Sequence, residues 1–193
     1  MKENRKVLYV LVAIALILSV AGISIGFAAM SQELKIEGQT EVVPASWKIK
    51  FDNLSSPTIT GAATVEHTPT LTDTRIYDYD FQLTKPGDSI SYTFDVKNTG
   101  TIDAELSTFT MAVPTYTGTD PTTGEADATI VKNNLVYTLT YSDGSAIATG
   151  QTLNHGETKT LKLTVSYPTA ADTLPEHEVD ITGMNVTFIY GQK

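Results

Sequence analysis

The chain has no cysteine among its 193 residues. Without thiols it cannot form a disulfide framework, bind structural zinc through thiolates or use a cysteine nucleophile. Basic residues are also few, because 13 Lys and Arg stand against 22 Asp and Glu, for a formal net charge of -9. Proteins that neutralise a nucleic-acid backbone need a basic face, so we expect no nucleic-acid partner.

Two common sequence signatures of catalysis and nucleotide binding are missing as well. There is no H-E-x-x-H zinc motif and no phosphate-binding loop of the G-x-x-x-x-G-K-[ST] type. The three histidines, His67, His155 and His177, are predicted to lie in turns or loops and do not have the spacing of zinc ligands on one helix. We therefore expect a protein that is not an enzyme and has no catalytic, metal-binding or cofactor-binding residues.

What the sequence does contain is a long apolar run behind a basic start. Lys2, Arg5 and Lys6 precede the uncharged stretch 7–30. These are parts of a secretory signal, and 24 uncharged residues exceed the roughly 20 that a membrane-spanning helix needs. Residues 1–30 are therefore predicted to be a signal peptide or an uncleaved membrane anchor. Either form places the rest of the chain outside the membrane, because the basic side stays in the cytoplasm.

The end of this run is the expected region of cleavage by a signal peptidase. It consists of an aromatic residue, two small residues and a methionine: Phe27, Ala28, Ala29 and Met30. Small residues before the cut are typical of secretory signals. We therefore expect an extracellular or cell-surface protein, which contacts the membrane through residues 7–30 before cleavage or without it.

Alternation of apolar and polar residues with period two dominates the chain after residue 43. The clearest segments, rich in β-branched and aromatic residues, are 47–51, 90–96, 136–141, 161–165 and 186–190. Since strands with one apolar face need a second sheet to cover that face, residues 44–193 are predicted to be all-β. The expected architecture is a two-sheet antiparallel sandwich of the jelly-roll or immunoglobulin type, preceded by an N-terminal hydrophobic helix.

Parts of this domain lack strand alternation. Residues 58–73 and 115–125 have few apolar positions and many turn-forming residues, so they are predicted to be exposed loops. A short helical turn is expected near residues 127–133.

Residues 31–43 join the apolar run to the domain and have an alternation of their own. Leu34 and Ile36 stand between Glu33, Lys35 and Glu37. An extended segment of this kind can pair with an open sheet edge of another copy, and such head-to-tail contacts build filaments because they do not close. The candidate residues of this intersubunit strand are Met30, Leu34, Ile36 and Val42. The alternative is a first strand or a stalk of its own subunit.

Three features, in order, resemble the TasA/camelysin family of exported surface and biofilm-matrix proteins. Gly26–Met30 is similar to the aromatic-Ala-Ala ending of signals in that family. Phe81–Gly100 is similar to its stretch of a Pro-Gly-Asp turn, a strand and Asn-x-Gly, and Val186–Tyr190 is similar to its last strand. The resemblance implies a jelly-roll-like sandwich whose subunits form extracellular fibres, with the mature N-terminal segment added as a strand to the next subunit. The apolar run is longer than is usual in the family.

These observations leave three functional hypotheses. The first is a non-catalytic exported structural protein that self-associates into extracellular filaments or contributes to biofilm matrix. The alternative is a monomeric, membrane-tethered surface adhesin or binding module. A third is implied by the resemblance alone: a camelysin-like metallo-endopeptidase that uses His177 and the neighbouring Glu176 and Glu178.

Overall fold

The computed structural model describes residues 11–17, 41–171 and 173–193. Contacts within the chain define two units, Met1–Val43 and Pro44–Lys193. In the first unit, residues 11–17 form helical turns. No helix within the described ranges combines the length and the apolar character that crossing a bilayer requires.

Most residues predicted for cleavage and strand addition lie outside the described ranges: Phe27, Ala28, Ala29, Met30, Leu34 and Ile36. Val42 is described, its side chain is 88% exposed, and it belongs to no helix or strand. The leader and the intersubunit strand therefore stay predictions.

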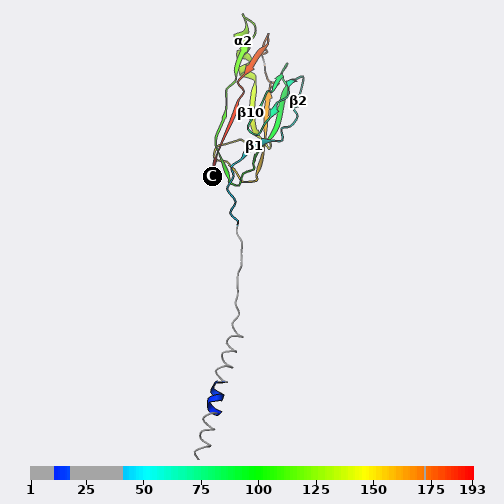
Figure 1. The fold of residues 1–193 in the computed structure, drawn as a ribbon. Helices are drawn as coiled ribbons and strands as arrows, with labels where there is room; N and C mark the ends of the chain where they lie inside the picture. The colour runs from blue at the N-terminus through cyan, green and yellow to red at the C-terminus, as the bar shows by residue number, and fades with distance from the viewer. Residues whose placement is uncertain (1–10, 18–40, 172) are drawn as a thin grey trace, which may run out of the picture. The chain divides into compact units, whose positions relative to one another are not determined.

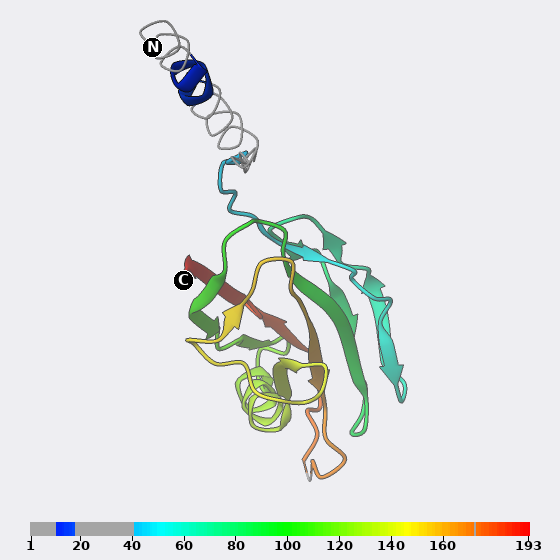
Figure 2. The same ribbon diagram turned by 90° about the horizontal axis from the view of Figure 1, so that it is seen from below.

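β-Strands dominate the second unit and pair antiparallel in several sheets (Figures 1 and 2). In chain order they are β1 (Ile49–Asp52), β2 (Thr58–Thr60), β3 (Thr64–His67), β4 (Thr70–Leu71), β5 (Ile76–Tyr77), β6 (Asp80–Gln82), β7 (Ser89–Asn98), β8 (Ala104–Met111), β9 (Thr115–Gly118), β10 (Val136–Tyr141), β11 (Thr152–Leu153), β12 (Thr158–Ser166), β13 (Val179–Thr182) and β14 (Val186–Gln192). The helix α2 (Gly124–Asn134) lies between β9 and β10 in the sequence. The predicted all-β class is confirmed.

A five-stranded sheet has the order β1-β7-β12-β10, and β2 pairs with β7 beyond the end of β1. Alternation along β7 places Tyr92 and Phe94 on the same face of this sheet. The register sets them opposite Leu163 and Leu161 of β12. Apolar pairs directly across two strands stabilise a sheet, so this face becomes the floor on which other elements pack.

A second sheet contains three strands in the order β11-β8-β14. Beyond a break in the pairing, β8 is continued by β9 and β14 by β13. β9 and β13 pair with each other, with Thr115 opposite Thr182. The N–H of Ala112 donates to the carbonyl of Asn185 across this break at 2.8 Å. These four strands therefore form one long antiparallel ribbon, of which β14 is the red C-terminal strand in Figure 2.

One apolar cluster joins the two sheets. Its buried members are Phe94, Val96, Leu139 and Leu161 of the five-stranded sheet, Ala104, Leu106 and Leu153 of the three-stranded sheet, and Ile147 between β10 and β11. A second cluster packs the β3–β6 hairpin onto the other end of β7, where Ile90 and Tyr92 meet Val65 and Phe81. Burial of each valine, leucine, isoleucine or phenylalanine among them stabilises the fold by about 1.5–3 kcal/mol.

Two fully buried polar side chains hold the turns at the ends of β7. Asp88 accepts hydrogen bonds from backbone N–H groups before the strand. After the strand, the Asn98 amide donates to the carbonyls of Ile102 (2.8 Å) and Leu153 (3.1 Å) and accepts from Gly100 N–H (3.0 Å). The Pro-Gly-Asp and Asn-x-Gly motifs therefore fix the turns at the two ends of β7.

The two predicted loops contain regular structure, so these predictions were wrong. Residues 58–73 include β2, β3 and β4, and residues 115–125 include β9 and the start of α2. His67, predicted in a loop, lies at the end of β3. These strands are only two to four residues long. Because their partners can lie far along the chain, as β13 does for β9, local alternation does not reveal them.

The helical turn expected at residues 127–133 is confirmed and belongs to the longer helix α2. Glu125 and Asp127 lie in its first turn and Lys132 in its last, charges that complement the helix dipole. α2 begins close against β9, since a Cβ at Gly118 would overlap the backbone of Gly124. In Figure 1 the helix lies at the end of the domain.

Candidate functional site

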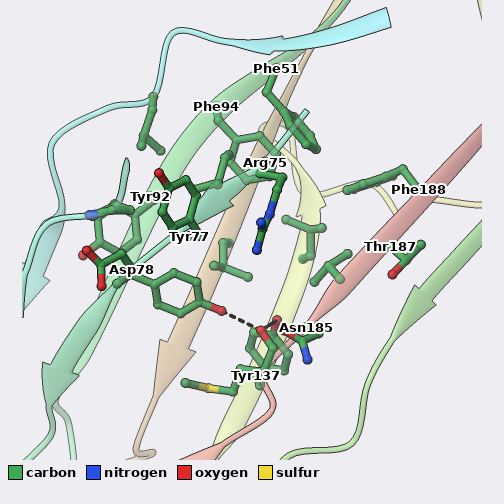
Figure 3. Close-up of a pocket in the computed structure, with 18 of the residues that line it drawn as sticks. Phe51, Arg75, Tyr77, Asp78, Tyr92, Phe94, Tyr137, Asn185, Thr187 and Phe188 are labelled. Carbon is green, nitrogen blue, oxygen red and sulfur yellow. Dashed lines mark hydrogen bonds between the residues drawn. The ribbon is translucent and has the colours of Figure 1, made fainter. Parts of the chain in front are cut away.

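An open cavity of about 640 Å³ lies over the apolar face of the five-stranded sheet (Figure 3). Its floor consists of Tyr92, Phe94, Tyr137, Leu139 and Leu163. One wall is the turn and end of the β4–β5 hairpin, residues 74–79, and the other is the corner between β13 and β14, residues 181–188. This volume lies in the range of roughly 300–1,000 Å³ typical of binding pockets.

A second hollow of about 360 Å³ continues from the first between β1 and β14. Phe51, Thr74 and Phe188 line both hollows. The rings of Phe51 and Phe188 meet edge to face at 6.1 Å between centroids, so a residue of the five-stranded sheet touches one of β14. The two hollows together are called the aromatic groove below.

Both strands beside the aromatic groove are sheet edges. β1 and β14 stand at the ends of their strand orders, and within the described residues no strand pairs with their outer sides. The hairpin turn covers part of β1, because Phe51 N–H donates to the carbonyl of Asp73 at 2.8 Å. β14 is therefore the more open edge, and an open edge offers unpaired N–H and C=O groups to another extended segment.

Tyrosine hydroxyls hold one wall of the groove in place. Tyr79 and Tyr137 both donate to the carbonyl of Met184, at 2.6 and 3.1 Å, and so fix the corner between β13 and β14. Burial raises the pKa of both phenols, which keeps them protonated as donors. The hydroxyl of Tyr92, a residue only 4% exposed, has no hydrogen-bond partner in the described part of the chain.

Three cations line the groove, and two of them are paired. Lys48 lies 3.2 Å from Asp73, and Lys50 lies 2.9 Å from Asp52. The hydrogen bond that Lys50 donates to the Asp52 carboxylate raises the pKa of Lys50. The third cation, Arg75, lies with its guanidinium carbon 5.2 Å from the centre of the Tyr77 ring.

His177 belongs to a different cluster, at the start of α2. Its Nδ1 lies 2.9 Å from Thr123 Oγ1 and 3.3 Å from Asp127 Oδ2. The backbone N–H of Glu176 donates to Asp127 and lowers the pKa of that carboxyl. A hydroxyl nucleophile activated by histidine needs the hydroxyl on one ring nitrogen and a carboxylate bonded to the other. Here Thr123 and Asp127 both contact Nδ1, and the Asp120 carboxylate lies 4.0 Å from Nε2, beyond hydrogen-bond distance. Among the described residues, no three His, Cys, Asp or Glu side chains group as metal ligands.

The aromatic groove was not predicted from the sequence, although part of it had a signal. Tyr77, Tyr79 and Phe81 alternate with Asp78 and Asp80, a strand pattern just after the stretch that was predicted to be a loop. The tyrosines Tyr77 and Tyr79 line the groove. Of the predicted strand-addition residues, only Val42 is described, and the other three lie outside the described ranges.

Comparison with known proteins gives no relative for this chain. No protein-family model, no curated protein and no solved structure matches the chain.

Proposed function

We propose that this protein is a non-catalytic, exported structural subunit of extracellular filaments or biofilm matrix, assembled by strand addition between copies. Residues 31–43 of one subunit enter the aromatic groove of the next and pair with β14. The observation that carries the proposal is an open strand edge beside an apolar groove. Such an edge is a ready site for an added strand.

We also infer that the domain is a β-sandwich of the jelly-roll kind with one strand position left for a neighbour. The apolar cluster shared by the two sheets supports this, because face-to-face sheets build their core from both inner faces. The groove lies where that core is uncovered, between β1 and β14.

The segment has the length and pattern that this role requires. β14 spans seven residues, and the 13 residues of 31–43 reach about 43 Å when extended at roughly 3.3 Å each. With Leu34 and Ile36 toward the aromatic floor, the charged residues beside them, Glu33, Lys35 and Glu37, face away from the floor toward the mouth of the groove. Val42 and Val43, at the domain boundary, are 88% and 69% exposed.

Strand addition of this kind predicts assembly without any further component. Because each subunit offers its own segment and accepts that of another, the contact is heterologous and does not close. The family resemblance points to the same assembly, and export through residues 1–30 places it outside the cell. N-terminal sequencing of the exported protein that finds a start at Ala29 or Met30 supports filament assembly. A chain that still begins at residue 1 favours a tethered monomer.

Deletion of residues 31–36 is expected to abolish filaments while leaving the domain folded. The deletion removes both apolar residues that enter the groove, and no described element of the domain includes them. Electron microscopy of the exported protein reads out filaments, and circular dichroism reads out the fold. Thr149→Ala, at an exposed loop residue outside the groove, serves as the control. Filaments of normal length after the deletion contradict the proposed function.

Thr74→Trp is expected to reduce assembly by filling the groove with a side chain of its own subunit. Thr74 is exposed and lines both hollows, so the larger ring has room without disturbing the core, and the free energy of unfolding should change by less than about 0.5 kcal/mol. Thr149→Trp, at an exposed loop residue outside the groove, is the matched control. Equal sedimentation of the two variants as polymer argues against this groove as the acceptor.

A further inference from the structure

Arg75 has a fixed place beside the groove. Its backbone closes the turn of the β4–β5 hairpin: Thr72 N–H donates to Arg75 O at 2.8 Å, and Arg75 N–H donates to Thr72 Oγ1 at 3.1 Å. Figure 3 shows its guanidinium reaching into the cavity, between Tyr77 and the β14 residues Thr187 and Phe188. A strand lying in the groove would therefore pass next to this cation.

Among the described residues, Arg75 is also the groove cation that has no carboxylate partner. Lys48 and Lys50 are paired with Asp73 and Asp52, whereas in the part of the chain that the structure describes no carboxylate lies within ion-pair distance of Arg75. A guanidinium binds carboxylates through two parallel hydrogen bonds, which gives both energy and orientation. The groove therefore offers an anion site to whatever enters it.

The segment proposed to enter the groove has the matching charge pattern. When Leu34 and Ile36 face the aromatic floor, period two turns Glu33, Lys35 and Glu37 toward the mouth. Residues 31–43 carry three glutamates and one lysine, so the segment is acidic overall.

We propose that Arg75 sets the register of the added strand by pairing with a glutamate of the incoming segment, Glu33 or Glu37. This inference rests on the proposed function and specifies which residues of the incoming segment contact Arg75. A slip of one residue turns the apolar pair away from the floor. A slip of two residues places Lys35 beside Arg75, and like charges in contact are disfavoured. The favoured registers are therefore those that place a glutamate beside Arg75.

Charge reversal tests the pairing in the full-length chain, expressed with its own leader in a secreting host and harvested from the medium and cell surface. Arg75→Glu should raise the concentration needed for polymer at least about tenfold, since like charges at an interface cost several kcal/mol. The combined Glu33→Lys and Glu37→Lys variant should show a similar loss. Combining all three substitutions should bring the concentration needed for polymer back to within about threefold of the wild-type value. Sedimentation of a dilution series measures this concentration.

Lys162→Glu, at an exposed position of β12 outside the groove, makes the same change in net charge and serves as the control. An Arg75→Glu variant that polymerises like this control overturns the pairing. So does a triple variant that remains as defective as its parents. In either case, loss of filaments on deletion of residues 31–36 would leave the proposed function intact, whereas survival of filaments in that deletion would refute the function itself.

Discussion

Asp88→Ala is expected to lower the free energy of unfolding by about 3–5 kcal/mol. The carboxylate is fully buried and accepts from the N–H groups of Ala62 (2.7 Å), Thr84 (2.8 Å) and Lys85 (3.0 Å), and from the Thr84 hydroxyl (3.0 Å). Without it, these donors lose their acceptor in a place that water does not reach. Gly61 allows this approach, because a Cβ there would overlap Asp88 Oδ1.

The same carboxylate makes stability depend on pH. Burial raises the pKa of Asp88, but the hydrogen bonds from Ala62, Thr84 and Lys85 outweigh it and lower the pKa from 3.8 to about 2. A depressed pKa contributes stability above the unfolded value, and that contribution is lost as pH falls toward the folded value. The difference in the free energy of unfolding between wild type and Asp88→Ala should therefore be constant above about pH 5. It should shrink between about pH 4 and pH 2.

Urea denaturation followed by circular dichroism at several pH values measures both effects. Asp180→Ala, at an exposed residue of β13, should change the free energy of unfolding by less than about 0.5 kcal/mol. An Asp88→Ala protein as stable as this control at neutral pH would show that the four hydrogen bonds contribute little.

Gly118→Ala is expected to destabilise the domain by at least about 2 kcal/mol, at the upper end of overpacking costs. The added Cβ overlaps the backbone O, Cα and C of Gly124. No flexible side chain can yield there, so β9 and the start of α2 have to separate. The reciprocal change, Gly124→Ala, brings a Cβ to 2.8 Å from the carbonyl oxygen of Gly118 and should have the same direction.

The matched control is Gly191→Ala in β14, where an added Cβ meets no atom within 4 Å. This substitution should leave the midpoint of thermal unfolding within about 2 °C of the wild type, because a small change in free energy moves the midpoint little. If Gly118→Ala unfolds at the same temperature as Gly191→Ala, the contact between β9 and α2 is looser than described.

Five strands of the two main sheets, β1, β7, β10, β12 and β14, were predictable because each has a local alternation signal, whereas β2, β8 and β11 were not predicted. The segment 136–141 became β10 with the same bounds, and 161–165 and 186–190 became parts of β12 and β14. Side chains of an extended chain alternate between two faces by covalent geometry alone. A half-buried strand whose apolar residues keep this alternation therefore shows its face in the sequence.

The turn motifs were predictable in position but not in role. Pro-Gly-Asp and Asn-x-Gly indicated turns at the ends of a strand, which the structure confirms. That Asp88 and Asn98 are fully buried and bind distant backbone groups did not follow from them. The partners of these side chains, Ala62 and Leu153, come from other elements of the fold.

The sequence by itself determined an acidic, cysteine-free, all-β domain behind a long apolar run, because composition and period-two alternation are local properties. Only the tertiary structure decided that Phe51, Arg75 and Phe188 line one groove, and that β14 is left open beside it. These residues lie up to 137 positions apart. Strand pairing and sheet packing bring them together, and both depend on long-range contacts that no short stretch of the chain encodes.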